Sequence, residues 1–243
     1  MSYTFGVQLY SLKDYTDYSL SLRTIVDNGC KNVEFYTTYG LDGKEMKRIL
    51  DDLGMKGISA HVGFIDDFNS DAFKKQVEFN HQVGNEHIVL PGYAFPTIEE
   101  AKRSIDRIGK MMEMFKREGF SFGYHNHAHE FKLFEDGTCP MDYVVRINGI
   151  KLQPDVFWLK TAGVDPVEFL KKHSDKLISV HLKEYGENGR NIEFGNGILP
   201  WREIMDVAEK AGAPIGIIEQ EEYSVDPLDS IKTCLKNLNT IFN

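Results

Sequence analysis

The chain has few cysteines, no dense cluster of basic residues and no phosphate-binding glycine motif. Its three cysteines, Cys30, Cys139 and Cys234, are scattered and odd in number, which excludes a disulfide framework and favours free thiols in a reducing compartment. A formal net charge of -9 argues against nucleic acid as a partner, because binding a polyanion usually needs a basic surface. Without GxGxxG or GxxxxGK[ST], a dinucleotide or nucleoside triphosphate site has no support.

Long apolar runs are also missing, and the N-terminus lacks a basic segment followed by an apolar one. These absences predict a cytoplasmic protein with no membrane partner, although a leader already removed would leave no mark on the sequence. No linker, low-complexity tract or strong repeat divides the chain, so we expect a single domain over residues 1–243. Its 42% hydrophobic content is enough to fill a sizeable core.

Short β-like runs alternate with helix-length amphipathic segments, and eight such pairs can be counted. The expected strands are 5–12, 32–36, 57–64, 86–92, 121–127, 152–158, 177–184 and 214–220. The clearest helical patterns are 98–118 and 201–211, each with a glycine near its C-terminal end. Eight βα units predict a parallel sheet closed into an α/β (β/α)8 barrel, or TIM barrel, rather than a doubly wound sheet.

Polar residues fall on the inward-facing parity of at least seven of these strands. Because successive strand residues face opposite sides, Phe122 and Tyr124 would pack outward on helices while their neighbours face the interior. The inward set includes Gln8, Tyr10, Glu34, Tyr36, His61, His125, His127, Asp155, Ser179, His181, Lys183, Glu219 and Glu221. Burying these groups is costly unless they pair, meet solvent or hold a metal, so the pattern predicts a functional cavity.

Four residues of divalent-metal ligand type lie at or near the C-terminal ends of four successive strands: His125, Asp155, His181 and Glu219. Strand ends are where a β/α barrel assembles its active site. Taken singly, each has a structural alternative, such as a hydrogen-bonded strand histidine or an aspartate capping a turn. Taken together they predict one metal site, with His127 an equal alternative to His125 as the first ligand.

The segments GVQLYSL, GYHNHAHEF, LQPDVFWLKTAGVDPVEF, VHLKEY and IIEQEE occur in this order. Over essentially the whole chain they resemble the sugar phosphate isomerase/epimerase family of xylose isomerase-like barrels, near its inosose dehydratase and 3-keto-glycoside branch. The resemblance implies one Mn²⁺, Co²⁺, Mg²⁺ or Zn²⁺ held by Glu, Asp, His and Glu, of which Asp155, His181 and Glu219 match the last three. Many relatives have Glu-Asn-His where this chain has His125-Asn126-His127.

That difference bears on the mechanism that the resemblance implies, in which two carboxylates move a proton through an enediolate beside the metal. Glu219 remains as a base, and His125 or His127 would bind the metal or act as general acid and base. Glu130 is a candidate replacement carboxylate, although the direction of its side chain is unreadable. Lys183 would neutralise an enediolate or pair with an inner carboxylate.

Candidate substrate contacts are weaker, because core packing or a structural hydrogen bond competes at each position. They are Gln8, Tyr10, Glu34, His61 and Trp158. The stretch 195–197, Gly-Asn-Gly, is either a backbone nest for phosphate or, more in keeping with its context, a plain turn. The scarcity of inward arginine leaves phosphate recognition unsupported.

We therefore expect a metal-dependent isomerase or epimerase of a small-molecule sugar or keto-sugar. A lyase or hydratase acting on keto-sugars or 3-keto-glycosides is the second interpretation, because it shares the enolate and needs no mirrored pair of bases. A non-catalytic sugar-binding barrel and a zinc-dependent DNA-repair endonuclease of the same fold are the other classes, and the acidic charge counts against the endonuclease. Such barrels often form homo-oligomers, but no interface can be identified from the sequence.

Overall fold

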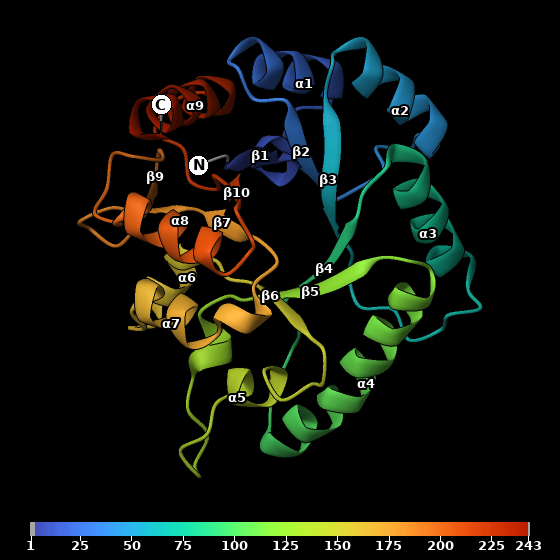
Figure 1. Ribbon diagram of the computed structural model, residues 1–243, viewed down its shortest axis with the longest axis vertical. Coiled ribbons are helices and arrows are strands. Elements are labelled where there is room, and N and C mark those ends of the chain that lie inside the picture. The colour runs from blue at the N-terminus through green and yellow to red at the C-terminus, as the bar shows by residue number, and fades with distance from the viewer. Residues whose placement is uncertain (1–2, 243) are drawn as a thin grey trace.

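A computed structural model describes residues 3–242, which form a nearly closed ring of eight parallel strands surrounded by helices (Figure 1). The strands are β1 (Thr4–Gln8), β2 (Asn32–Phe35), β3 (Lys56–His61), β4 (His87–Pro91), β5 (Ser121–His125), β6 (Lys151–Gln153), β7 (Val180–Leu182) and β10 (Ile215–Ile218). Their order is β6-β5-β4-β3-β2-β1-β10-β7, and two isolated parallel bridges link β6 to β7. The prediction of a (β/α)8 barrel is confirmed.

The helices lie outside this ring (Figure 1). They are α1 (Tyr18–Asp27), α2 (Gly43–Asp52), α3 (Asp71–Val83), α4 (Ile98–Arg117), α5 (Pro140–Val144), α6 (Val156–Thr161), α7 (Pro166–Lys172), α8 (Trp201–Lys210) and α9 (Pro227–Phe242). Short 3-10 helices occupy Leu9–Leu12, His129–Phe131 and Ser174–Lys176, and an antiparallel hairpin pairs β8 (Glu184–Tyr185) with β9 (Asn191–Ile192). The predicted helices 98–118 and 201–211 each match to within one residue.

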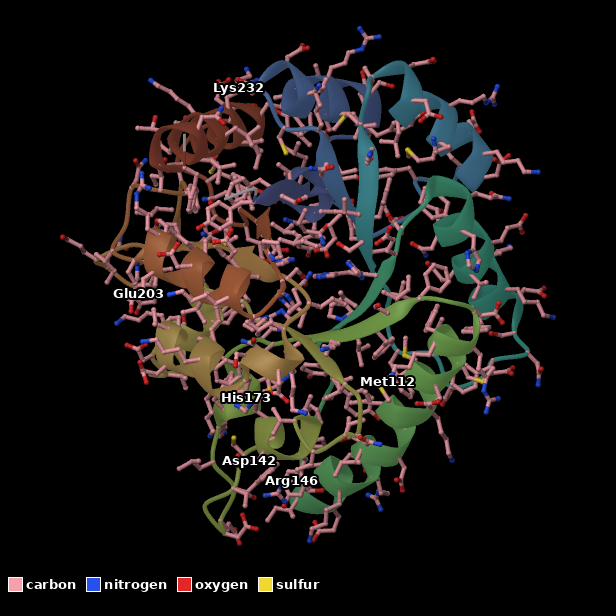
Figure 2. The ribbon with its side chains drawn as sticks, viewed as in Figure 1. Met112, Asp142, Arg146, His173, Glu203 and Lys232 are labelled. Carbon is pink, nitrogen blue, oxygen red and sulfur yellow. The ribbon has the colours of Figure 1, made fainter. Side chains whose placement is uncertain are left out.

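Helix α4 shows why these segments form where they do. Thr97 caps it, with its side-chain oxygen accepting a hydrogen bond from the backbone N–H of Glu100 at 3.2 Å. Its buried residues, among them Ile108, Met112 and Phe115, recur at helical spacing and face the sheet. Met112 is therefore buried, whereas Glu203 of α8 and Lys232 of α9 lie on the outer surface (Figure 2).

The core lies between the strands and the helices. Phe122 and Tyr124 of β5 are buried in it, as the alternation predicts. Other strand residues of this layer include Val7, Phe35, Ile88, Leu90, Leu152, Val180 and Ile218. In the interior of the ring, by contrast, the buried residues of β1, β2, β6 and β7 include Gln8, Glu34, Gln153 and His181.

The predicted strands are longer than the observed ones, and two of them extend furthest beyond the observed C-terminal end. The strand expected over 5–12 ends at Gln8, whose side-chain oxygen accepts a hydrogen bond from the Tyr10 N–H at 3.1 Å and starts the 3-10 helix that follows. The strand expected over 152–158 ends at Gln153, because Asp155 is the N-cap of α6. Asp155 Oδ1 accepts from the N–H groups of Phe157 and Trp158 at 2.9 and 3.1 Å. Asp155 thus reaches the site from a helix cap and not from a strand.

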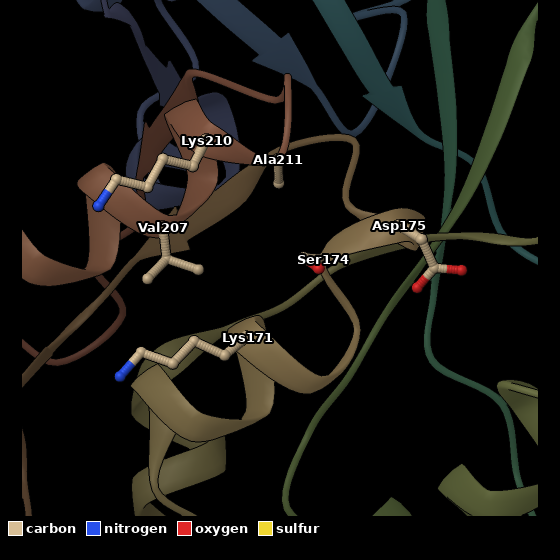
Figure 3. Close-up of a pocket in the computed structure, with 6 residues that line it drawn as sticks. All are labelled: Lys171, Ser174, Asp175, Val207, Lys210 and Ala211. Atoms are coloured by element: carbon tan, nitrogen blue, oxygen red, sulfur yellow. The ribbon is translucent and has the colours of Figure 1, made fainter.

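A surface groove of about 500 Å³ lies between α7 and α8, with Lys171, Ser174 and Lys210 among its lining residues (Figure 3). These residues lie near the ends of helices that lead into β7 and β10, so the groove is at the N-terminal end of the strands. The functional cavity lies at the opposite end. Within residues 3–242, no helix combines the length and apolar character needed to cross a membrane.

Candidate metal centre and active site

A cavity of about 340 Å³ opens at the C-terminal end of the barrel. Its lining residues end or follow β1, β2, β3, β4, β5 and β10, and they are Tyr10, Tyr36, His61, Gly63, Pro91, His125, His127, Glu219 and Glu221. This is the end at which the sequence predicts convergence of polar side chains.

The four predicted ligands come together at this cavity. One ligand atom from each of His125, Asp155, His181 and Glu219 lies within 4.8 Å of the others, and all four residues are buried. His181 Nδ1 is 3.3 Å from Glu219 Oε2, and His125 Nε2 is 3.9 Å from Asp155 Oδ2. Nitrogen and carboxylate oxygen donors in this combination suit a divalent cation.

Asp155 provides the clearest sign that the group fits a cation. Its Oδ1 is used by the helix cap, but Oδ2 is buried and has no hydrogen-bond partner among residues 3–242. Burial raises the pKa of Asp155 to about 7, against the opposing effect of the Lys183 charge. A buried carboxylate oxygen without a donor is unfavourable, and a bound metal would supply the missing partner.

His181 is held between two carboxylates. Its Nε2–H donates to Glu34 Oε1 at 2.6 Å, while Nδ1 faces Glu219. Burial opposes protonation of the ring, but Glu34 and Glu219 outweigh it and raise the His181 pKa to about 10. An imidazolium therefore balances the two carboxylates when no metal is bound. If His181 held a metal, the Nε2–H bond to Glu34 would fix the orientation of its ring.

Glu34 lies beneath the cavity and is fully buried. Its carboxylate accepts hydrogen bonds from His181, Gln8, Ser59 and Gln153, and His61 Nε2 lies 3.1 Å from its Oε1. Burial alone would raise the pKa of Glu34, but His61 and His181 hold it well below its usual value. Gln8 is also fully buried, so Gln8 and Glu34 have no surface for the substrate contact expected of them. Glu34 instead contacts His61 and His181, and Gln8 donates to Glu34.

Gln153 belongs to this network and was not predicted. Its Oε1 accepts from His61 Nε2 at 2.7 Å and from His125 Nδ1 at 3.2 Å. Because an amide oxygen only accepts, His125 carries its proton on Nδ1 and its lone pair on Nε2, toward Asp155. The sequence did carry a signal, since Gln153 shares the inward parity of Asp155 in the segment LQPD.

His127 and Glu130 take positions different from those of the four-residue group. His127 lines the cavity, and burial lowers its pKa to about 4, so its ring is neutral at pH 7. Glu130 is buried, accepting from the His127 backbone N–H and from the Tyr124 hydroxyl, both at 2.8 Å. Glu130 therefore holds the turn after β5, and it gathers with His127 and His129 rather than with Asp155.

Lys183 is buried beside the cavity. Its Nζ lies 2.6 Å from Glu221 Oε1 and 3.7 Å from Glu219 Oε2, and 4.7 Å from the centre of the Trp158 ring. Burial opposes the charge, but Glu219, Asp155 and Glu221 raise the pKa of Lys183, so it is an ammonium group at neutral pH. Of the other predicted contacts, Tyr10 and His61 line this cavity and Trp158 lines an adjoining groove.

The carboxylate of Glu184 lies beside the Gly195-Asn196-Gly197 stretch. The Glu184 carboxylate accepts from the N–H groups of Gly195 and Leu199 at 2.9 and 3.3 Å, and from the Trp201 indole. A Cβ added at Gly197 would lie 2.5 Å from Glu184 Oε1. The loop is a turn built around Glu184, which leaves no support for phosphate binding by these N–H groups.

These observations define a β/α barrel with a buried cluster of metal-ligand type at the C-terminal ends of its strands. Residues 22–240 match the family described as xylose isomerase-like TIM barrel. The chain belongs to this family, as the resemblance of its motifs predicts. No curated protein matches the sequence.

Several solved structures share the fold. A sugar phosphate isomerase/epimerase from Parabacteroides distasonis ATCC 8503 is 24% identical, with a TM-score of 0.82 over 98% of each chain. The 3-keto-D-glucoside 4-epimerase YcjR from E. coli is 18% identical, with a TM-score of 0.71 over 98% of this chain and 100% of that one. The IolI protein with a bound zinc atom is 14% identical, with a TM-score of 0.77 over 98% and 97%.

Proposed function

We propose that the protein is a divalent-metal-dependent isomerase or epimerase of a sugar or keto-sugar. The observation that carries the proposal is the unpartnered Asp155 Oδ2, buried within a group whose other ligand atoms come from His125, His181 and Glu219. These four residues would hold Mn²⁺, Co²⁺, Mg²⁺ or Zn²⁺. Bound there, the metal would polarise a substrate carbonyl and acidify the neighbouring C–H.

Glu219 is the base in this proposal. It lines the cavity, and it is ionised at neutral pH because Lys183 and His181 outweigh its burial and lower its pKa to about 2. The Lys183 ammonium group, 3.7 Å from Glu219, stabilises the negative charge that develops on the substrate as the proton leaves.

His127 is the proton donor and acceptor on the other side. It follows β5, three strands around the ring from the β10 end that carries Glu219. His125 is used as a ligand and His61 Nε2 is hydrogen-bonded to Gln153, so the neutral His127 ring is the imidazole of the cavity wall that we assign to proton exchange on the opposite face of an enediolate. Epimerisation needs such a pair of groups on two faces.

A lyase or hydratase is the second candidate, and one observation favours it. A two-carboxylate mechanism needs a second carboxylate after β5, where this chain has histidine. Glu130 does not replace it, because its carboxylate accepts hydrogen bonds from Tyr124 and the His127 backbone. Elimination from a keto-sugar needs one base to remove a proton and one acid to protonate the leaving group. Glu219 as the base and His127 as the acid are sufficient for this reaction.

The proposal is tested by incubating the metal-loaded protein in D₂O with ketoses and 3-keto-glycosides and following the products by NMR. We expect deuterium at a carbon next to a carbonyl, with an epimer or isomer as product; an unsaturated product would assign the lyase reaction. A sample treated with chelator should show no exchange. Bound metal with no exchange on any of these sugars would contradict both reactions and indicate a sugar-binding barrel.

A further inference from the structure

A second hollow adjoins the catalytic cavity. It is an open groove of about 630 Å³, lined by Pro91, Gly92, Tyr93, Ala94, His127, Ala128, His129 and Trp158. Pro91 and His127 line both hollows. The catalytic cavity and the groove are therefore adjacent and share part of their walls.

The groove presents aromatic rings whose positions are fixed. Tyr93 packs edge-on against Phe64, with ring centres 5.1 Å apart, and Trp158 packs edge-on against Phe157 at 4.9 Å. Such rings commonly pack against the C–H face of a sugar or against another aromatic ring. Because they are already held by neighbours, little conformational entropy is lost when a ligand ring binds.

Two nitrogen atoms in this wall lack hydrogen-bond partners. His127 Nδ1 and Trp158 Nε1 are both buried and unpaired among the described part of the chain, and their rings are 5.6 Å apart. An indole N–H can only donate, whereas one nitrogen of a neutral imidazole accepts and the other donates. Hydroxyl, ether or carbonyl oxygens of a ligand would satisfy both, and an unpaired buried polar atom is otherwise unfavourable.

The lining also determines which ligands do not fit. It contains no Lys, Arg, Asp or Glu side chain, so it offers no permanent charge to pair with a phosphate or a carboxylate. Gly92 lets the wall of the groove approach His127 closely, because a Cβ there would lie 3.1 Å from His127 Nδ1 and its backbone φ is +87°. The groove is thus suited to a neutral ring with oxygen substituents.

We propose that the groove is a second subsite, which binds a ring joined through a glycosidic oxygen to the sugar that reacts in the catalytic cavity. The substrate class is then a glycoside whose second ring is a pyranose or an aromatic group. This inference rests on the proposed function only in placing the reacting sugar in the catalytic cavity.

Binding measurements on the metal-loaded protein test the subsite. The probes are methyl and 4-nitrophenyl glycosides of glucose, galactose, mannose and xylose, together with cellobiose and lactose, compared by calorimetry. For at least one sugar we expect the affinity of the two-ring ligand to be at least tenfold higher than that of the methyl glycoside. Trp201 is buried and the other tryptophan is Trp158, so a change in tryptophan fluorescence should accompany two-ring binding.

The variant Tyr93→Ala should reduce this affinity ratio to about one, whereas Tyr18→Ala, which lines neither hollow, should keep it. Tighter binding of the disaccharides than of the methyl glycosides would assign a pyranose as the second ring. Tighter binding of the nitrophenyl glycosides alone would assign an aromatic group. A ratio near one for every sugar, or a ratio that survives Tyr93→Ala, would overturn the subsite. The subsite is tested by binding and the reaction by deuterium exchange, so the two can fail separately. Tighter binding of a two-ring ligand without deuterium exchange would contradict only the proposed reaction. Deuterium exchange with an affinity ratio of one would contradict only the subsite.

Discussion

Glu219→Gln is expected to lower turnover by about 10²–10⁴-fold, the usual contribution of a general base. Glutamine keeps the size of the side chain and one oxygen near the metal, but it cannot accept the substrate proton. The rate of deuterium incorporation per bound metal measures the effect, so that weaker metal binding is not mistaken for slower proton transfer.

Glu222→Gln is the matched control. Glu222 is an exposed carboxylate on the same loop, 2.8 Å from the Arg190 guanidinium, and its loss should leave the exchange rate unchanged. If Glu219→Gln retained the exchange rate of the unaltered protein at full metal loading, Glu219 would not be the base.

His181→Ala is expected to weaken metal binding by more than the 10–100-fold typical of losing an outer-shell partner, and with it to abolish activity. The metal-free protein should also lose about 3–5 kcal/mol of stability, because Glu34 and Glu219 would face each other without the imidazolium between them. Metal titration and thermal unfolding measure the two effects separately.

His181→Gln restores a neutral hydrogen-bonding group if the alanine variant folds poorly, and His81→Ala, on the exposed face of α3, controls for the loss of any histidine. Unchanged metal affinity in a folded His181 variant would remove His181 from the site.

The sequence was sufficient to predict the barrel and the group of ligand-type residues, because both depend on patterns that repeat along the chain. Alternation on β5 placed His125 inward and Tyr124 outward, and the structure agrees. The end of β6 was predicted wrongly because residues 156–158, Val-Phe-Trp, are apolar and are compatible with a strand, whereas in the structure they begin α6. The capping hydrogen bonds of Asp155, which turn the chain into α6, give no signal in apolar alternation.

The network under the cavity was less predictable. Gln153 donates to Glu34 across 119 residues of sequence, and their meeting depends on the register and stagger of strands that are not neighbours. Glu130 illustrates the same limit, because its sequence position was visible but the direction of its side chain depends on the Tyr124 hydroxyl and on the turn at His127.

The central claim is tested most directly by elemental analysis of the purified protein after equilibration with Mn²⁺, Co²⁺, Mg²⁺ and Zn²⁺, in parallel with Asp155→Asn. Asparagine keeps an oxygen to cap α6 but removes the charge at Oδ2, so the variant should fold and lose the metal. The account predicts close to one metal ion per chain in the unaltered protein and far less in the variant. No bound metal with any of the four ions, or equal metal in both proteins, would contradict it.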